Sequence, residues 1–358
     1  MKKVLLATLC FGCGSSSSGE SAAPKAAAIA QPYSDPALAP QLAKLDALLQ
    51  EQLTVHQFPG LVAAVVTRDG IVWTKAYGVR DLETRAPMSL DTLFRLSSIT
   101  KVFTALGVLQ LRDRGVLDLD APVSRWVPEL ADAVPVSHDS PPITLRHLMT
   151  HRSGLPREIQ ISDPYGLMHE ISEAELLASL PTTRLDSTTG TTEAYSNLGA
   201  ALEGLVIARA SGRTYTAYME DELLRPLGMP TATFDRDRIS PAARTASYLR
   251  DKDGSMRPAP LFHEGATAAR GQFYATIREL AQFASVELLA WPPREEVELG
   301  PVRRSTLRES QRTEGPCPPG SHTKGAGWFL EATSRGVIVE HSGGGEGFLS
   351  DIWLSPTS

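Results

Sequence analysis

The chain is poor in cysteine and in basic clusters, and each shortage excludes a class of protein. Only three of the 358 residues are cysteine, and Cys10 and Cys13 lie at the very start. Cys317 is the only thiol left in the rest of the chain, so an exported domain has no internal disulfide to form. The formal net charge is −6 and no basic cluster offsets it. This balance argues against a nucleic-acid-binding protein.

Long apolar runs are also missing, and the apolar N-terminal stretch is too short to span a bilayer. A basic start followed by a short apolar stretch predicts a secretory signal peptide over residues 1–13. The text around Cys13 resembles a bacterial lipoprotein signal, in which the cysteine is lipidated and becomes the new N-terminus. We therefore expect an exported, periplasmic or cell-envelope protein, anchored to the membrane through Cys13. Simple cleavage and export without a lipid is the alternative.

Residues 14–36 are mostly Ser, Ala, Gly and Pro, which predicts a flexible tether because this composition cannot bury a core. Residues 37–358 are predicted to form one α+β domain. A helical period runs over about 40–57, and two apolar runs flank Arg68-Asp69-Gly70, which predicts a hairpin. Helical patterns dominate about 115–260. Strand patterns return at 327–331, 337–340 and 350–354. The plan is a strand-rich unit built from both chain ends, with a helical unit between them.

Ser98 and Lys101 are the first candidates for chemistry. Residues three apart lie on one face of a helix, and a desolvated, neutral lysine can take the proton of a serine. The pattern alone is weak, because Ser321 and Lys324 repeat it in a Pro/Gly-rich stretch. However, the apolar run at 102–111 predicts a buried helix after Ser98, and its N-terminus would offer free N–H groups to an oxyanion. A helix start with a surface lysine is the alternative.

Two more short patterns accompany this pair. Tyr195 and Asn197 form a Tyr-x-Asn pattern at the start of a second apolar helix. His341 and Gly343 form a His-x-Gly pattern at the end of a predicted strand, followed by Gly344. Taken alone, the first pattern also fits a turn tyrosine and a helix N-cap asparagine.

In this order the three patterns resemble the motifs of the serine β-lactamases and penicillin-binding-protein-like hydrolases. The nearer branch is class C, which also holds family VIII esterases, D-aminopeptidases and D-Ala-D-Ala carboxypeptidases. The flanking text agrees at 94–98, 148–156, 226–229 and 325–328. The resemblance covers residues from about Leu45 onward. It implies an antiparallel sheet flanked by helices, a helical subdomain inserted over about 115–260, and a site between them. It also leads us to expect that the C-terminal part of the fold is truncated.

The resemblance implies a role for each candidate. Ser98 would attack an ester, amide or lactam carbonyl and form an acyl-enzyme. Lys101 and Tyr195 would share the general base and acid duties in either order, and a nearby cation would lower the pKa of Tyr195. Asn197 would orient the substrate amide or the Lys101 amine. The backbone N–H groups of Ser98 and Gly344 would form the oxyanion hole.

His341 departs from the family pattern, because lactamases and transpeptidases usually carry lysine there. A histidine is mostly neutral at pH 7, so substrate binding by His341 and Gly343 would hold a carboxylate weakly. We therefore expect an esterase or peptidase-like enzyme acting on a small molecule or peptide. A true β-lactamase and an inactive tethered binding or sensing domain are the alternatives. No cofactor or metal is expected: His147 and His151 are spaced like a metal pair, but the metalloprotease motif is absent.

Overall fold

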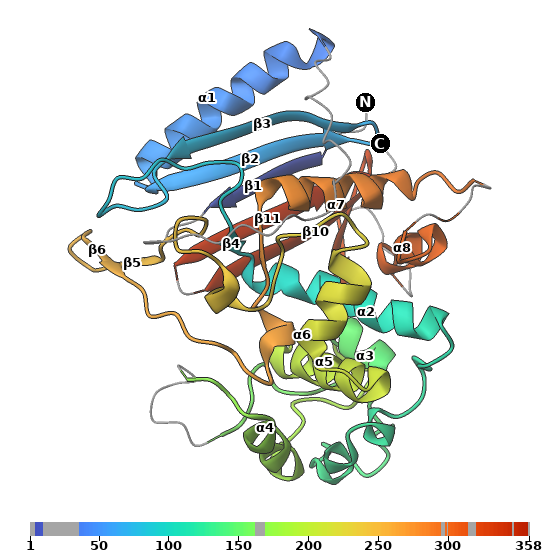
Figure 1. Ribbon diagram of the computed structural model, residues 1–358. Helices are drawn as coiled ribbons and strands as arrows, with labels where there is room; N and C mark the ends of the chain where they lie inside the picture. Colours follow the sequence, from blue (N-terminus) through green and yellow to red (C-terminus); the bar gives the residue numbers. More distant parts are fainter. Residues whose placement is uncertain are drawn as a thin grey trace.

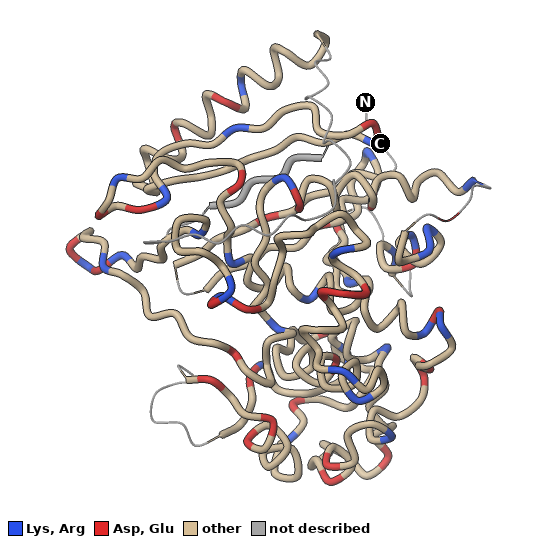
Figure 2. Tube along the Cα trace, viewed as in Figure 1, with Lys and Arg blue, Asp and Glu red and all other residues tan. Residues whose placement is uncertain are grey.

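The computed structural model describes residues 4–9, 36–161, 169–294, 298, 300–313, 320–345 and 347–356. Cys13, Cys317 and the predicted tether up to residue 35 lie outside these ranges. Within them, no helix has both the length and the apolar character needed to cross a membrane. Acidic and basic residues are interspersed over the described part of the chain (Figure 2).

A seven-stranded antiparallel sheet forms one layer (Figure 1). Its order is β3-β2-β1-β11-β10-β9-β8. The strands are β1 (Val4–Leu9), β2 (Gly60–Thr67), β3 (Gly70–Gly78), β8 (His322–Lys324), β9 (Phe329–Thr333), β10 (Gly336–Gly345) and β11 (Phe348–Leu354). The predicted hairpin is confirmed as β2 and β3, whose turn holds Gly70 at φ 120°. Strands from both chain ends meet at the centre, as the sequence predicts.

β1 covers part of the stretch predicted to be a signal peptide. Its backbone pairs with β2 on one side and β11 on the other, with Leu5 opposite both Val65 and Trp353. A short apolar run fits a buried strand as well as a signal peptide, and periodicity does not separate the two. Export therefore stays a prediction.

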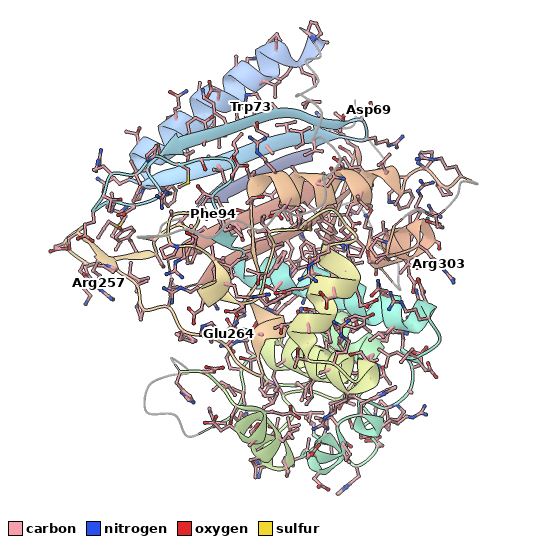
Figure 3. The ribbon with its side chains drawn as sticks, viewed as in Figure 1. Asp69, Trp73, Phe94, Arg257, Glu264 and Arg303 are labelled. Carbon is pink, nitrogen blue, oxygen red and sulfur yellow. The ribbon has the colours of Figure 1, made fainter. Side chains whose placement is uncertain are left out.

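The helices are α1 (Ala39–Val55), α2 (Thr100–Asp113), α3 (Leu145–Met149), α4 (Glu173–Ser179), α5 (Asn197–Ser211), α6 (Tyr215–Tyr218), α7 (Ile277–Leu289) and α8 (Arg304–Ser310). The helix predicted over about 40–57 is confirmed as α1, which lies along β2 and β3 (Figure 1). Its Leu49 packs against Leu61 and Tyr77, and Trp73 adds to this cluster (labelled in Figure 3). α1 thus covers one face of this half of the sheet.

The main core lies on the other face of the sheet, which α7 covers, and it includes the buried side chains of α2. Phe103 on α2 is fully buried, with its ring 4.6 Å from Phe273 and 4.4 Å from Phe283 between centroids. Truncating such a phenylalanine to alanine costs about 3–5 kcal/mol of stability. The helix that follows the nucleophile candidate is therefore anchored rigidly.

The inserted region is less helical than predicted. α3 to α6 fall inside residues 115–260, and a π-helix (Met219–Leu224) follows α6. The rest of this region consists of turns, short 3-10 helices and the hairpin of β5 (Tyr248–Arg250) and β6 (Met256–Pro258). Ser172 and Glu175 form a capping box at the start of α4. Prolines between these helices interrupt the helical hydrogen bonds, which explains the shorter elements.

Candidate active site

Ser98 lies in a single 3-10 turn, Ser97–Ile99, which continues directly into α2. Ser97 has φ 45°, in the left-handed region that non-glycine residues rarely adopt. Thr100 donates a hydrogen bond from its hydroxyl to the Ser97 carbonyl at 2.6 Å and holds this turn. The turn brings the Lys101 Nζ to 3.4 Å from the Ser98 Oγ. The structure thus places the serine and the lysine on one face, as the spacing predicts.

Lys101 is buried, with 2% of its surface exposed. Its Nζ donates a hydrogen bond to the backbone carbonyl of Arg270 at 2.6 Å. Burial lowers the pKa of Lys101 to about 7, because the charged form loses its water. The carboxylate of Glu264 opposes this shift and the guanidinium of Arg270 adds to it. Near neutral pH a large share of Lys101 is therefore an uncharged amine that can accept a proton.

Tyr195 packs between several cationic or aromatic groups. Its ring centroid lies 4.9 Å from the Lys101 Nζ, 5.0 Å from the Arg157 Cζ and 4.6 Å from the His151 ring. Burial nevertheless raises the pKa of Tyr195 to about 12, although a hydrogen bond with Ser98 and the charge of Arg157 act in the opposite direction. The expectation of a lowered pKa is wrong, because loss of water outweighs the neighbouring charges. Tyr195 is a proton donor at neutral pH.

Asn197 is the first residue of α5, but it is not the cap. Ser196 caps the helix, since its hydroxyl accepts from the backbone N–H of Gly199 at 2.9 Å. The backbone N–H of Asn197 donates to the Arg157 carbonyl at 2.7 Å. Its side-chain Nδ2 donates to Glu158 Oε1 at 2.6 Å. The side chain is therefore fixed by a neighbouring loop.

Gly343 and Gly344 lie on β10, which extends through Gly345. A Cβ on Gly343 would lie 2.2 Å from the Leu96 carbonyl oxygen and 3.1 Å from the Ser98 nitrogen. Only glycine therefore allows the strand to come this close to the serine. Ser350 on β11 donates a hydrogen bond to the same Leu96 carbonyl at 2.8 Å.

His341 is buried behind the site, with 2% of its surface exposed. Its ring lies 4.9 Å from Phe329 and 6.5 Å from Tyr195 between centroids. Burial lowers the pKa of His341 to about 3, and the charge of Lys101 adds to this effect. Its Nδ1 lies 2.6 Å from the Ser342 carbonyl, to which it donates. His341 is therefore a neutral packing partner of the tyrosine.

A cavity of about 520 Å³ opens in front of the serine, and we call it the Ser98 pocket. This size suits a small-molecule or short peptide ligand. Ser98, Asn197 and Gly344 are the predicted site residues that line it, whereas Lys101, Tyr195, His341 and Gly343 do not. The remaining lining residues are Arg95, Ser97, Arg157, Glu158, Leu249, Pro260, Phe262, Glu264, Arg270, Gly271 and Gly345.

Comparison with known proteins agrees with this arrangement. The profile of the family described as Beta-lactamase matches residues 45–358. The chain belongs to the beta-lactamase family. It is 34% identical over 239 residues to esterase EstB of Burkholderia gladioli, covering 63% of this chain and 60% of that protein. It is 28% identical over 341 residues to the D-alanyl-D-alanine-carboxypeptidase/endopeptidase AmpH of Escherichia coli K12, covering 91% and 83%.

Solved structures support the same beta-lactamase fold. A penicillin-binding protein homologue from Pyrococcus abyssi matches with a TM-score of 0.71 at 22% identity, over 87% of this chain and 73% of that one. The chain spans about half the length of several curated relatives that it matches. The fold class inferred from the sequence, an antiparallel sheet flanked by helices, is confirmed.

The beta-lactamase motifs do not include four charged residues that the structure brings into the Ser98 pocket. Arg95 pairs with Glu264, which also binds Arg270 Nε at 2.7 Å. Arg270 Nη1 lies 3.0 Å from Glu158 Oε2. These residues come from two loops, a 3-10 turn and a two-residue strand, and only Glu264 and Arg270 are close in the sequence. Their proximity emerges only from the fold.

The two histidines spaced like a metal pair have structural roles. His147 completes the capping box of α3 with Thr144. His151 has φ 55°, and its Nδ1 accepts from the backbone N–H of Ser196 at 3.2 Å. This bond fixes the segment that carries Tyr195, a role that the sequence reasoning missed.

One group among the described residues could offer three metal ligands. It consists of Asp235, Asp237 and His263, whose ligand atoms lie within 4.8 Å of one another. Asp235 is already engaged by Arg238, with Nε and Oδ2 3.4 Å apart. None of the three lines the Ser98 pocket.

Proposed function

We propose that this chain is a serine hydrolase that cleaves an ester or amide through an acyl-enzyme on Ser98. The observation that carries the proposal is a buried lysine with a pKa of about 7, whose Nζ lies 3.4 Å from the serine Oγ. A general base is most effective when its pKa lies near the working pH. Lys101 meets this condition, and Tyr195 with a pKa of about 12 does not.

The proposed reaction has two steps. Lys101 takes the proton of Ser98 as Oγ bonds to the substrate carbonyl carbon. The backbone N–H groups of Ser98 and Gly344 stabilise the oxygen that becomes negative. Tyr195 donates its proton to the leaving oxygen or nitrogen as that bond breaks, and the Lys101 ammonium restores it. Water then attacks the acyl carbonyl carbon and gives a proton to Lys101. Lys101 returns this proton to the Ser98 Oγ as the bond to the acyl group breaks, so the acid leaves and Ser98 and Lys101 are regenerated.

Esters and peptides fit this site better than β-lactams. The pKa of about 3 keeps His341 uncharged, so it offers no cation to a lactam carboxylate. Among the relatives, one is named an esterase and one a carboxypeptidase/endopeptidase. Both names support an esterase or peptidase-like activity. A true β-lactamase is the competing assignment, and nitrocefin tests it.

Covalent labelling tests the nucleophile directly. The full chain is incubated with a fluorophosphonate probe, and the adduct is located by peptide mass spectrometry. We expect a single adduct on Ser98 and its loss in Ser98→Ala, with Ser321→Ala as the matched control. Turnover of p-nitrophenyl butyrate, a D-Ala-D-Ala peptide and nitrocefin then ranks the substrates. A folded wild-type protein without an adduct would instead favour a binding or sensing domain.

We also propose export and lipid anchoring at Cys13, because the N-terminal text has the basic, apolar and small-residue order of such signals. Metabolic labelling with an alkyne fatty acid should mark the wild type and not Cys13→Ala. Membrane association that survives this substitution would contradict the proposal.

A further inference from the structure

Arg270 lies at the junction of the two helices that carry the site. It ends the 3-10 turn Ala268–Arg270, which packs against both α2 and α5. Its carbonyl accepts the hydrogen bond from Lys101 at 2.6 Å. Its side chain is 13% exposed and lines the Ser98 pocket.

The guanidinium of Arg270 joins one rigid carboxylate to one adjustable carboxylate. On the rigid side, its Nε lies 2.7 Å from Glu264 Oε2. Glu264 is buried, pairs with Arg95 and accepts a hydrogen bond at its carbonyl from Thr267 at 2.8 Å. On the other side, the Arg270 Nη1 lies 3.0 Å from Oε2 of Glu158, whose side chain is 37% exposed. Arg270 therefore holds Glu158 in place relative to the buried pair of Arg95 and Glu264 (Glu264 is labelled in Figure 3).

Glu158 in turn fixes the amide of Asn197. Its Oε1 accepts from the Asn197 Nδ2 at 2.6 Å. A carboxylate can only accept hydrogen bonds, so the amide nitrogen must face Glu158 and the amide oxygen must face away from it. Charge-assisted hydrogen bonds of this kind are about twice as strong as neutral ones. The pair therefore decides which end of Asn197 meets the substrate or the lysine.

We propose that Arg270 is a positioning residue for this reaction: its carbonyl places the Lys101 amine, and its guanidinium holds Glu158 so that Asn197 presents its amide in one orientation. The inference rests on the proposed function, since it assigns a role within the same site. Every side-chain substitution keeps the backbone carbonyl, so variants at position 270 isolate the role of the guanidinium.

A double-mutant cycle separates this role from a purely structural ion pair. Arg270→Met should lower kcat/KM for p-nitrophenyl butyrate about 10- to 100-fold in the wild-type background. In the Asn197→Ala background the same change should cost less than about threefold, because the group that Arg270 positions is gone. Equal losses in both backgrounds would overturn the proposal.

Two further variants serve as control and rescue. Arg278→Met removes an arginine whose Nε binds Asp91 Oδ1 at 2.7 Å outside the pocket, and it should leave kcat/KM unchanged. Arg270→Lys keeps the charge and loses the two-armed geometry. It should restore part of the activity that Arg270→Met loses. No gain of Arg270→Lys over Arg270→Met would count against positioning by charge.

The pH profile of kcat/KM gives a second readout that a structural role would not move. The charges that act on Lys101 come from Glu264, Glu158 and Glu203, which raise its pKa, and from Arg270, which lowers it. Arg270→Met should therefore shift the acid limb to higher pH, and Glu158→Gln should shift it to lower pH. Glu158→Gln also guards against misfolding, because Glu158 is partly exposed. An acid limb that does not move in either folded variant would overturn the proposal.

Fluorophosphonate labelling distinguishes a failure of the proposed function from a failure of the role proposed for Arg270. If the folded wild type is not labelled on Ser98, the proposed function fails. If it is labelled and turns over the ester, but the cycle with Asn197 is additive, the proposed function stands and the role of Arg270 fails.

Discussion

The chain contains two Ser-x-x-Lys segments, and the fold treats them in opposite ways. Ser98 and Lys101 lie on a helical turn, where residues three apart share a face and the two polar atoms come within 3.4 Å. Ser321 directly precedes β8 and Lys324 ends it. In extended backbone, residues three apart point to opposite faces. The same spacing therefore creates a pair in one place and separates the partners in the other.

The two lysines also differ in the groups that surround their Nζ atoms. Both are buried and both have a lowered pKa, with burial as the first cause. Lys324 has a carboxylate partner, Glu193, with Nζ and Oε1 3.4 Å apart. Lys101 instead faces a backbone carbonyl and the serine. A lysine that an ion pair keeps charged is structural, whereas one without such a pair can act as a base.

The largest expected effect comes from removing the serine of each segment. Ser98→Ala should lower ester turnover by roughly 10³- to 10⁶-fold, because the nucleophile is lost. Ser321→Ala should keep the rate within about twofold. Initial rates with p-nitrophenyl butyrate measure both, after circular dichroism has shown that the variants fold. Comparable losses of rate in the two variants would contradict the assignment of Ser98 as the nucleophile.

Removing the lysines should give the next largest difference. Lys101→Met should cost roughly 10²- to 10⁴-fold in kcat, the usual contribution of a general base. Lys324 lacks this role, so Lys324→Met should change kcat less than about threefold, although Glu193 loses its cationic partner. Steady-state kinetics with the same ester give the ratio. If Lys324→Met lowered kcat as much as Lys101→Met does, the assignment of Lys101 as the general base would be wrong.

The pH dependence should identify Lys101 as the group that must lose a proton. Because the pKa of Lys101 is about 7, kcat/KM should fall about tenfold per pH unit below that value and level off above it. Tyr195, with a pKa of about 12, stays protonated throughout this range. A profile from pH 5 to 9 with a neutral ester measures the limb. A flat profile would mean that Lys101 is not the base.

A smaller effect is expected at His341, whose pKa of about 3 leaves it uncharged at every pH of the assay. His341→Lys adds a cation near Tyr195 and should improve acylation by nitrocefin about three- to tenfold relative to the neutral ester. The ratio of the two kcat/KM values is the readout. His341→Gln is the matched neutral control, and the same gain in that variant would exclude a charge effect.

The last effect concerns stability rather than rate. The pKa of Lys101 falls from 10.5 to about 7 on folding, so between these pH values the unfolded chain binds more protons and the penalty of burying the charge shrinks as pH rises. Lys101→Met should therefore stabilise the protein most below pH 7 and progressively less toward pH 10.5. Urea unfolding at pH 6.5 and 9.5 checks this difference, with Lys324→Met as the comparison. If the stabilisation by Lys101→Met grew as the pH rose, the expected direction would be wrong.

Much of the fold follows from local patterns in the sequence. The hairpin at Gly70 and the capping box at Ser172 are set by residues close together in the chain, so their chemistry is visible there. The order of motifs also places Ser98, Lys101 and Tyr195 together. Caps were harder to assign, because Ser196 and Asn197 are adjacent good capping residues and only the geometry separates them.

The electrostatics of the site could not be predicted in the same way. A pKa depends on how much water a group loses, and this is a property of the packed interior. That is why Tyr195 was expected to have a lowered pKa and has a raised one. Arg270 and Glu158 were missed for a related reason. Glu158 lies in a loop and Arg270 ends a 3-10 turn, and their pairing across 112 residues exists only in the folded chain.

The approach of Gly343 to the turn that carries Ser98 has a consequence for how the chain folds. The hydrogen bond from Ser350 to the Leu96 carbonyl links positions 254 residues apart. Contacts with such large sequence separation carry a high loop-closure entropy and slow the folding of the chain. A chain still emerging from the ribosome would already carry its serine and lysine, but it would lack the strand that walls the Ser98 pocket. The order of synthesis would thus leave the Ser98 pocket incomplete until β10 and β11 have been made.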